Sequence, residues 1–443
     1  WEDVEHLGQD FRLMFDLVLN HCSRRSGWFR DFVIGIAPAS HYFLPVDPGT
    51  DLSEVVRPRS LPLLTKTATR AGEQWVWTTF SSDQVDLNWA NPDVLFEFLD
   101  ILFLYLSKGA EILRMDAVAF LWKRIGTPCL HLPETHEVVK LLRDVMDIVA
   151  PSAVLLTETN VPHEENLSYF GQGDEAHMVY NFALPPLLLH ALLRHDGSLL
   201  THWAASLPDL GNDRTFLNFT ASHDGIGLRP LQGLVDDEER DWVIEEVSRR
   251  GGRVSTRAMQ DGSNQPYELN ITWRDAMDEP GDPELGLARF LCSQAILLAF
   301  KGVPALYIHS LLGTPNDHER MIKTGHSRSI NRHQWDYPKL NTVLDDPETP
   351  QARAFNRITE IIGIRARQPA FHPNATQFTL QLGDKIFGFW RQSLDRDQSI
   401  FAIHNMTKEE VSIPAMSINL ITGSKWSDLL SGEAIDPARG DIT

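Results

Sequence analysis

One apolar segment, residues 109–117, limits the possible fold of this chain more than any other stretch. Its sequence, GAEILRMDA, is typical of a buried strand, and Arg114 and Asp116 stand two residues apart near its end. Residues two apart on a strand share a face. In a parallel barrel both side chains would point into the mouth at the carboxyl end of the strand, where barrel enzymes carry their chemistry. From this segment alone, an Arg–Asp ion pair that caps a strand is the alternative interpretation.

The pattern of strand, polar loop and helix repeats along the chain. Apolar runs that end in polar residues predict strands at 11–19, 110–116, 153–157, 177–180, 215–219 and 304–308. Amphipathic or apolar segments between them predict helices at 91–107, 134–149, 185–194, 199–207, 284–300 and 351–368. This alternation indicates an α/β protein with a parallel barrel or a doubly wound sheet.

Two long stretches interrupt the pattern and one ends it. Residues 24–86 are rich in proline and aromatic side chains, and residues 225–282 are charged and contain an acidic helical segment at 236–250. From residue 371 the hydrophobic pattern has a period of two, which is typical of antiparallel strands. We therefore predict a layered α/β domain over 1–370, with inserted subdomains at 24–86 and 225–282, and a C-terminal β domain over 371–443.

The composition excludes several classes of function. The formal net charge is −20, so neither nucleic acid nor an anionic membrane surface is expected as a partner. No apolar run approaches the ~20 residues that span a bilayer. The three cysteines, Cys22, Cys129 and Cys292, are far apart and have no metal-ligand spacing. A reducing compartment, the cytoplasm, is the predicted location.

Carboxylates stand at the ends of several predicted strands, and they suggest glycosidic bond cleavage. Such chemistry needs one carboxylate that attacks the anomeric carbon and one acid that protonates the leaving oxygen. Arg114 beside Asp116 would lower the pKa of that carboxyl and keep it an ionised nucleophile. Glu158 follows an apolar strand without a cation adjacent in sequence, so its pKa is free to be raised for the acid role. Asp16, His21, His223 and Asp224 complete the set of strand-end candidates.

Four of these segments together resemble the motifs of glycoside hydrolase family 13, the α-amylase family. Residues 16–21 (DLVLNH), 109–117, Glu158 and 222–224 (SHD) are similar to its first, second, third and fourth motifs, in that order. The resemblance implies a TIM (β/α)8 barrel. It also implies that Asp116 is the nucleophile, Glu158 the general acid/base and Asp224 the transition-state stabiliser.

Further segments resemble the sucrose phosphorylase subfamily. They are residues 223–227 (HDGIG), 180–192 (YNFALPPLLLHAL), 57–59 (RPR) and 328–333 (RSINRH). This resemblance implies a retaining α-glucosyl phosphorylase that releases α-glucose 1-phosphate through a covalent glucosyl-enzyme. The residues implied to hold the glucosyl unit are His21, Arg114, His223 and Arg328. Phosphate, a dianion, needs cations near the carboxylates, and Arg59 and Arg332 are the candidates.

The acceptor loop departs from the subfamily. Tyr267-Glu268 stands where sucrose phosphorylases carry Tyr-Gln, which argues against fructose as the acceptor. Segments 55–64, 76–80, 157–163 and 173–177 look most like glucosylglycerate phosphorylases, whose acceptor is an acid that Arg59 could bind. A sucrose phosphorylase or a related transglucosidase or hydrolase is the alternative, and an inactive sugar-binding barrel is the alternative from another class.

The resemblance carries three further expectations. Asn20 is similar to a calcium-binding position of amylases, but the phosphorylase subfamily generally lacks that ion, so we predict no metal and no cofactor. Family members have about two βα units ahead of the residue that matches Trp1, so the sequence resembles an N-terminally truncated piece of a barrel. The expected partners are a small glucoside and inorganic phosphate, with a homodimer left open.

Overall fold

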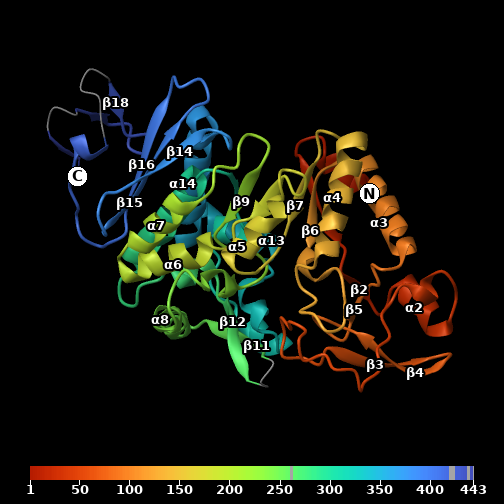
Figure 1. The fold of residues 1–443 in the computed structure, drawn as a ribbon. Helices are drawn as coiled ribbons and strands as arrows, with labels where there is room; N and C mark the ends of the chain where they lie inside the picture. Colours follow the sequence, from red (N-terminus) through yellow and green to blue (C-terminus); the bar gives the residue numbers. More distant parts are fainter. Residues whose placement is uncertain (260–262, 419–424, 437–439, 443) are drawn as a thin grey trace. The chain divides into compact units, whose positions relative to one another are not determined.

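A computed structural model describes residues 1–259, 263–418, 425–436 and 440–442 (Figure 1). The chain divides into two compact units. The first consists of Trp1–Tyr180 and Thr256–Tyr267, and the second of Asn181–Ser255 and Glu268–Thr443. Each unit is described by itself.

Parallel strands form the centre of the first unit. β1 (Leu13–Val18), β6 (Ala110–Asp116), β7 (Val154–Thr157) and β8 (Met178–Tyr180) pair in that order. The register sets Asp16 opposite Arg114 and Val18 opposite Asp116. The parallel arrangement therefore brings the polar ends of neighbouring strands to one edge, as the alternating pattern of the sequence predicts.

Two long helices connect these strands. α3 (Pro92–Ser107) and α4 (Pro133–Val149) each have a proline in the first turn, where its missing N–H costs nothing. Asn91 caps α3, because its side chain accepts a hydrogen bond from the Asp93 amide at 3.1 Å. Short helices complete the layer: α1 (Glu2–Leu7), η2 (Val118–Phe120), α5 (His163–Leu167) and η3 (Ser168–Phe170).

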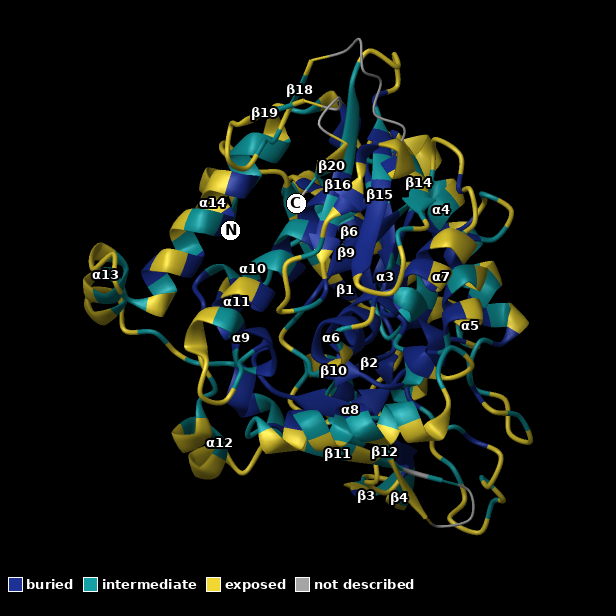
Figure 2. Cartoon of the chain, turned by 90° about the vertical axis from the view of Figure 1, so that its left-hand side faces the viewer, coloured by how far each residue is buried: buried dark blue, intermediate teal, exposed yellow. Residues whose placement is uncertain are grey.

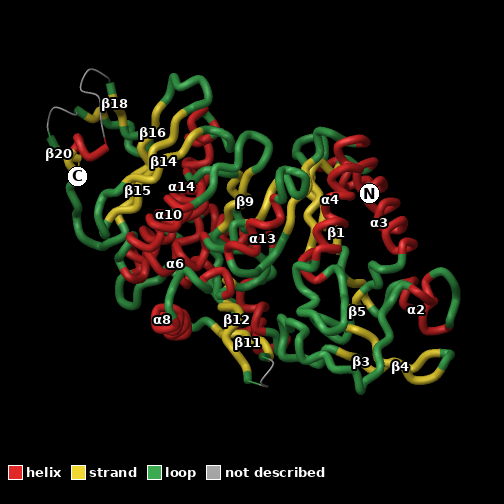
Figure 3. Tube along the Cα trace, viewed as in Figure 1, coloured by secondary structure: helices red, strands yellow, loops and turns green. Residues whose placement is uncertain are grey.

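The first predicted insertion is a loop-rich region with short antiparallel pairs (Figure 3). β2 (His21–Ser23) pairs with β5 (Gln84–Asp86), and β3 (Leu64–Thr69) pairs with β4 (Gly72–Trp77). α2 (Gly27–Ile34) and η1 (Ala39–His41) accompany them. Val55, Leu63 and Trp77 of this region form a small core together with Cys129, which lies between η2 and α4.

The second unit contains two parallel strands and most of the remaining helices. β9 (Thr215–Phe219) pairs with β13 (Val303–Ala305). The longer helices are α6 (Leu184–Arg194), α7 (Ser198–Ser206), α8 (Asp237–Arg249), α10 (Pro283–Ala299), α13 (Tyr337–Asp345) and α14 (Pro350–Ala366). The shorter ones are η4 (Arg229–Leu231), α9 (Trp273–Ala276), α11 (Ile308–Leu311), α12 (His318–Thr324), η5 (Ser327–Asn331) and η6 (Pro369–Phe371). In Figure 2, α8 is mostly exposed or half-buried, and only Val243 and Val247 of it are buried.

Antiparallel strands close the chain. β14 (Thr376–Leu380), β15 (Ile386–Gln392) and β16 (Ser399–Asn405) form one sheet, whose centre, β15, is largely buried (Figure 2). Phe389 of β15 meets Phe300 edge-on at 5.5 Å between ring centroids, so this sheet shares the core of α6, α7 and α10. Further short strands are β17 (Ile413–Pro414), β18 (Trp426–Ser427), β19 (Ala434–Ile435) and β20 (Asp441–Ile442), with η7 (Ala415–Ile418).

Three strands belong to the second predicted insertion: β10 (Ile226–Gly227), β11 (Arg253–Ala258) and β12 (Asn264–Asn270). β10 pairs antiparallel with the end of β12, at Leu269 and Glu268. The predicted strand at 304–308 ends earlier than expected, at Ala305, and Ile308 already begins α11. A short apolar run fits a strand or a helix start equally well, so its period does not separate the two.

The predicted fold class is confirmed. In the described part of the chain, six parallel strands alternate with helices, and antiparallel sheets follow from residue 376. The division into domains at residue 370 stays a prediction. None of the described helices combines the length and the apolar character that crossing a membrane requires.

Candidate active site

Arg114 organises three acidic side chains of the first unit. Its Nη1 atom donates to Asp16 Oδ1 at 2.5 Å and to Asp116 Oδ1 at 2.8 Å, and its Nη2 atom lies 3.9 Å from Glu158 Oε2. Its Nε atom donates to the Tyr180 hydroxyl at 3.1 Å. A planar guanidinium can serve several acceptors at fixed angles, which a lysine cannot do.

The fork of Arg114 therefore fixes the carboxylate of Asp116 in one orientation. The Arg114 side chain is 8% exposed, whereas that of Asp116 is 24% exposed. The cation is thus enclosed, and the carboxylate that it holds still reaches solvent. This is the arrangement that an attacking group needs, since it must be held and yet accessible.

Glu158 receives a second contact from an unusual backbone position. The amide of Ala117 donates to Glu158 Oε2 at 3.1 Å, and Ala117 has φ 50° and ψ 31°, in the left-handed region. No cation is adjacent to Glu158 in the sequence, but Arg114 approaches its carboxylate through space.

The charges around Arg114 determine its protonation. Burial by itself lowers the pKa of Arg114, but Glu158, Tyr180, Asp116 and Asp16 outweigh it and raise the pKa above its ordinary value. Burial also raises the pKa of Tyr180, against the opposing effect of Arg114. Arg114 is therefore a permanent cation, and the Tyr180 hydroxyl is neutral. The guanidinium carbon of Arg114, Cζ, lies 5.5 Å from the centroid of the Tyr180 ring.

His21 lies at the start of β2 and is 7% exposed. Its Nδ1 atom is 3.3 Å from Asn20 Nδ2, and its Nε2 atom is 2.8 Å from the Gln84 side-chain amide. The Phe80 ring packs against the imidazole at 5.4 Å. Burial lowers the pKa of His21, so the imidazole is neutral near pH 7.

The two predicted acceptor residues of the first unit lie together. Arg59 places its guanidinium carbon 5.3 Å from the centroid of the Tyr267 ring. Tyr267 is buried and Arg59 is half-buried. An arginine stacked on an aromatic face keeps its N–H groups free at the edge, where a carboxylate or a phosphate can bind them.

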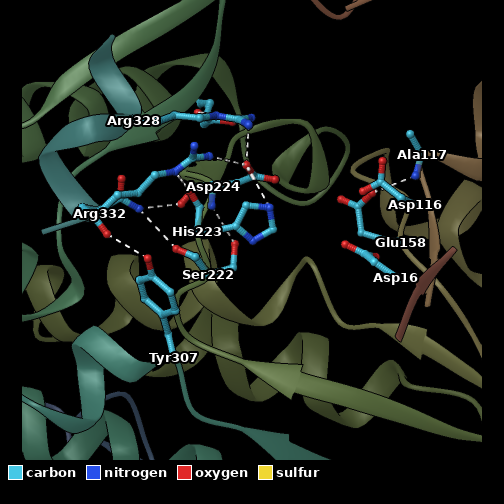
Figure 4. A network of polar contacts seen from close by, with 12 residues as sticks. Asp16, Asp116, Ala117, Glu158, Ser222, His223, Asp224, Tyr307, Arg328 and Arg332 are labelled. Atoms are coloured by element: carbon cyan, nitrogen blue, oxygen red, sulfur yellow. Dashed lines mark hydrogen bonds and ion pairs between the residues drawn. The ribbon is translucent and has the colours of Figure 1, made fainter. Parts of the chain in front are cut away.

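The remaining predicted residues meet in the second unit, around Asp224 (Figure 4). Arg328 donates to Asp224 Oδ1 through Nη1, and Arg332 Nη2 lies 3.3 Å from the same oxygen. Arg328 also binds Glu268 with two nitrogens, at 2.9 Å to Oε1 and 2.5 Å to Oε2. Glu268 is only 1% exposed, so its carboxylate is committed to Arg328.

Backbone groups shape the loop that carries Asp224. Arg332 Nε donates to the His223 carbonyl at 2.5 Å (Figure 4). Asn331 Nδ2 donates to the Asp224 carbonyl at 2.8 Å. The His223 side chain is 55% exposed, and its Nε2 atom lies 3.6 Å from Asp224 Oδ1. His223 is therefore a solvent-facing imidazole at the rim of this cluster.

The side chains that could bind a metal ion do not gather into a suitable group in the described part of the chain. Within the described ranges, no group of three or more His, Cys, Asp and Glu side chains could hold one. Asn20 Oδ1, the oxygen singled out by the resemblance to amylases, accepts a hydrogen bond from Lys123 Nζ at 2.6 Å.

Several contributors to these clusters were not among the predicted site residues, among them Tyr180, the amide of Ala117, and Lys123. Tyr180 ends a predicted strand, so the rule that drew attention to the other strand ends applies to it as well. The Ala117 amide depends on a backbone angle, and Lys123 on a contact to the inserted region, and neither leaves a signal in the sequence.

Comparison with known proteins agrees with this arrangement. Residues 5–201 match the profile of the Alpha-amylase family, described as alpha amylase, catalytic domain. The glucosylglycerate phosphorylase of Spirochaeta thermophila is 45% identical over 445 aligned residues, which cover 100% of this chain and 76% of that protein. The glucosylglycerate phosphorylase of Escherichia coli is 45% identical over 384 residues, covering 86% of this chain and 68% of that protein.

Among solved structures, sucrose 6F-phosphate phosphorylase from Thermoanaerobacter thermosaccharolyticum has the same fold. The TM-score is 0.74 at 24% sequence identity, and the match covers 93% of this chain and 85% of that chain. The strand pattern left a parallel barrel or a doubly wound sheet open, and this fold agrees with the barrel that the family resemblance implies. On the identity over its whole length, the chain belongs to the glucosylglycerate phosphorylases of the α-amylase family.

Proposed function

We propose that the protein is a retaining α-glucosyl phosphorylase that cleaves 2-O-α-glucosylglycerate with inorganic phosphate. The observation that carries the proposal is the 45% identity to a glucosylglycerate phosphorylase across the whole chain. Two carboxylates of the first unit around one buried arginine support it, since a retaining mechanism needs a nucleophile and an acid/base.

In the first step Asp116 attacks the anomeric carbon of the glucosyl unit while Glu158 gives its proton to the glycosidic oxygen. The C1–O bond to glycerate breaks, glycerate leaves with that proton, and a glucosyl ester on Asp116 forms. In the second step a phosphate oxygen attacks C1 as Glu158 takes up its proton. The ester bond breaks and α-glucose 1-phosphate forms, with two inversions giving net retention.

The other predicted residues receive roles that their contacts support. Arg114 orients Asp116 through its 2.8 Å hydrogen bond, and His21 and His223 bind sugar hydroxyls. Asp224, held by Arg328 and Arg332, stabilises the developing positive charge. Arg59 on Tyr267 takes the carboxylate of glycerate or the incoming phosphate, and Glu268 fixes Arg328.

The proposal includes the cytoplasm as its location. The three cysteines, Cys22, Cys129 and Cys292, are all free thiols, which favours a reducing compartment. It also includes a homodimer, and it includes neither nucleic acid nor an anionic membrane surface as a partner, because the net charge of −20 repels polyanions. Its small-molecule partners are the glucoside and phosphate.

The test is an assay of the protein in its natural full length with phosphate and either 2-O-α-glucosylglycerate or sucrose. We expect release of α-glucose 1-phosphate from the glycerate glucoside. Asp116→Asn and Glu158→Gln should each lower the rate by at least about 10³-fold. Asp10→Asn, an exposed carboxylate of the same unit, is the matched control and should leave the rate unchanged. Phosphate-independent hydrolysis as the main activity, or release from sucrose alone, would contradict the proposal.

A further inference from the structure

An enclosed ion pair lies beside His21 in the first unit. Lys123 Nζ is 2.6 Å from Asp86 Oδ2, and the two side chains are 4% and 0% exposed. Lys123 follows η2, and Asp86 ends β5 in the inserted region. Because burying two charges is costly, such a pair persists only where further hydrogen bonds satisfy it.

Those hydrogen bonds are present on Asp86. The Thr79 amide donates to Oδ1 at 2.8 Å, and the Thr79 hydroxyl donates to Oδ2 at 2.6 Å. Asn20 Nδ2 donates to Oδ2 at 2.9 Å. With Lys123, the Asp86 carboxylate accepts four hydrogen bonds, which is what a buried, ionised carboxylate requires.

Asn20 connects this pair to His21. Lys123 Nζ donates to Asn20 Oδ1 at 2.6 Å, and Asn20 Nδ2 lies 3.3 Å from His21 Nδ1. An ammonium group can only donate, so it must face the amide oxygen, and the amide nitrogen is then left to face the imidazole. The lysine thereby decides which end of the Asn20 amide meets the ring.

We propose that Lys123 is a positioning residue, whose ammonium group holds His21 neutral and unprotonated at Nδ1 through Asp86 and Asn20. This inference rests on the proposed function, in which His21 binds the glucosyl unit. The opposite ring nitrogen, Nε2, then carries the proton and faces the Gln84 amide, which can present oxygen or nitrogen according to how it is turned.

The charges around His21 agree with this role. Burial lowers the pKa of His21, Asp86 and Asp116 raise it, and Lys123 lowers it. These three charged groups come from β5, from β6 and from the loop after η2. If the Lys123 charge is removed, the two carboxylates remain and the pKa of His21 rises, so the ring becomes protonated at a higher pH.

The first test removes the positive charge of Lys123 and keeps the approximate length of its side chain. In Lys123→Met we expect kcat/KM for phosphorolysis to fall about 10²-fold, as for a misplaced binding group. The acid limb of the pH profile should also move to higher pH, which a purely structural defect would not cause. Lys123→Arg keeps a cation and should recover part of the loss. Lys66→Met is the matched control, because Lys66 and its partner Glu73 are 53% and 66% exposed.

The second test truncates the Lys123 side chain and supplies the ammonium group as a free small molecule. In Lys123→Ala, n-propylammonium matches the missing atoms and should restore activity, whereas n-propanol should not. The 15N signals of the His21 ring report its protonation independently of activity. They should show an unprotonated Nδ1 in the wild type and in the rescued variant.

The outcomes separate the two proposals. An unchanged kcat/KM together with unchanged His21 signals in Lys123→Met would overturn the role of Lys123. If Lys123→Met does not fold, the arginine and the amine-rescued alanine variants decide, and a refolded variant whose His21 signals are indifferent to the cation also overturns it. If the unaltered protein lacks phosphorolysis, the proposed function fails, and the ring signals still decide on Lys123.

Discussion

A single residue, Ala117, shows how backbone conformation serves the candidate acid/base. It directly follows Asp116, and its left-handed backbone, with φ 50°, directs its amide to Glu158 Oε2. For a residue with a Cβ atom this conformation costs roughly 1 kcal/mol, and glycine adopts it freely. The alanine therefore holds strain that the contact to Glu158 and the surrounding strand ends maintain.

Ala117→Gly should consequently stabilise the protein by about 0.5–1 kcal/mol, because it relieves this strain and retains the amide donor. Activity should change little, since Glu158 keeps its contact. Ala119→Gly, two residues on, is the matched control: Ala119 is 1% exposed and has no left-handed backbone, so the change should destabilise by about 1 kcal/mol. Urea denaturation measures both, and a loss of stability in Ala117→Gly would contradict the argument.

At the scale of elements, the stability of α14 depends on the residues that cap its N-terminus. Thr349 accepts a hydrogen bond from the Ala352 amide at 3.1 Å, and Pro350 occupies the first turn. The helix buries Ala352, Ala354, Ile358 and Ile361. The threonine cap followed by proline predicts the start of this helix from the sequence. Its apolar face packs on the core of the second unit.

Thr349→Ala should lower the free energy of unfolding by about 1 kcal/mol, because it leaves the Ala352 amide without its acceptor. Thr349→Ser keeps the hydroxyl and should restore most of the loss. Thermal unfolding of the three proteins decides the matter. Equal stability of the alanine variant and the wild type would show that the cap does not set the stability of this helix.

At the scale of the whole molecule, a buried histidine ties stability to pH. His404 of β16 is buried beside Phe387 and Phe389, and its Nδ1 atom lies 3.2 Å from the Phe387 carbonyl. Burial lowers the pKa of His404 to about 4, from an ordinary value of 6.5. The folded state therefore keeps the ring neutral where the unfolded chain already binds a proton.

The difference in the pKa of His404 between the folded and unfolded states fixes how stability changes with pH. Stability from His404 is complete above pH 6.5 and is lost as the pH falls toward 4, by up to about 3 kcal/mol. His404→Gln should flatten the stability profile in that window, whereas His6→Gln, an exposed histidine, should leave its slope unchanged. Denaturation at a series of pH values provides the measurement, and equal slopes for His404→Gln and the wild type would refute the assignment.

The sequence predicted most elements within a few residues, because their periodicity and caps are local. The strand at 215–219 has the predicted bounds, and the helix predicted at 134–149 begins one residue earlier, at Pro133. The strand at 304–308 was misplaced at its end, since α11 begins at Ile308 and a short apolar run has no distinctive period. Contacts such as Lys123 with Asp86 could not be predicted, because the two residues are 37 positions apart and only the packing of the elements between them, α3, β6 and η2, brings them together.

The sequence by itself determined the fold class and the identities of the candidate chemical groups, because strand ends, spacing and charge are properties of short segments. Only the tertiary structure decided what each group touches. Arg114 and Asp116 share a face by the period of a strand, but Asp16 and Glu158 reach the same guanidinium because β1, β6 and β7 pair in parallel. The segment at 109–117 therefore carries the chemistry, and its neighbouring strands supply the geometry.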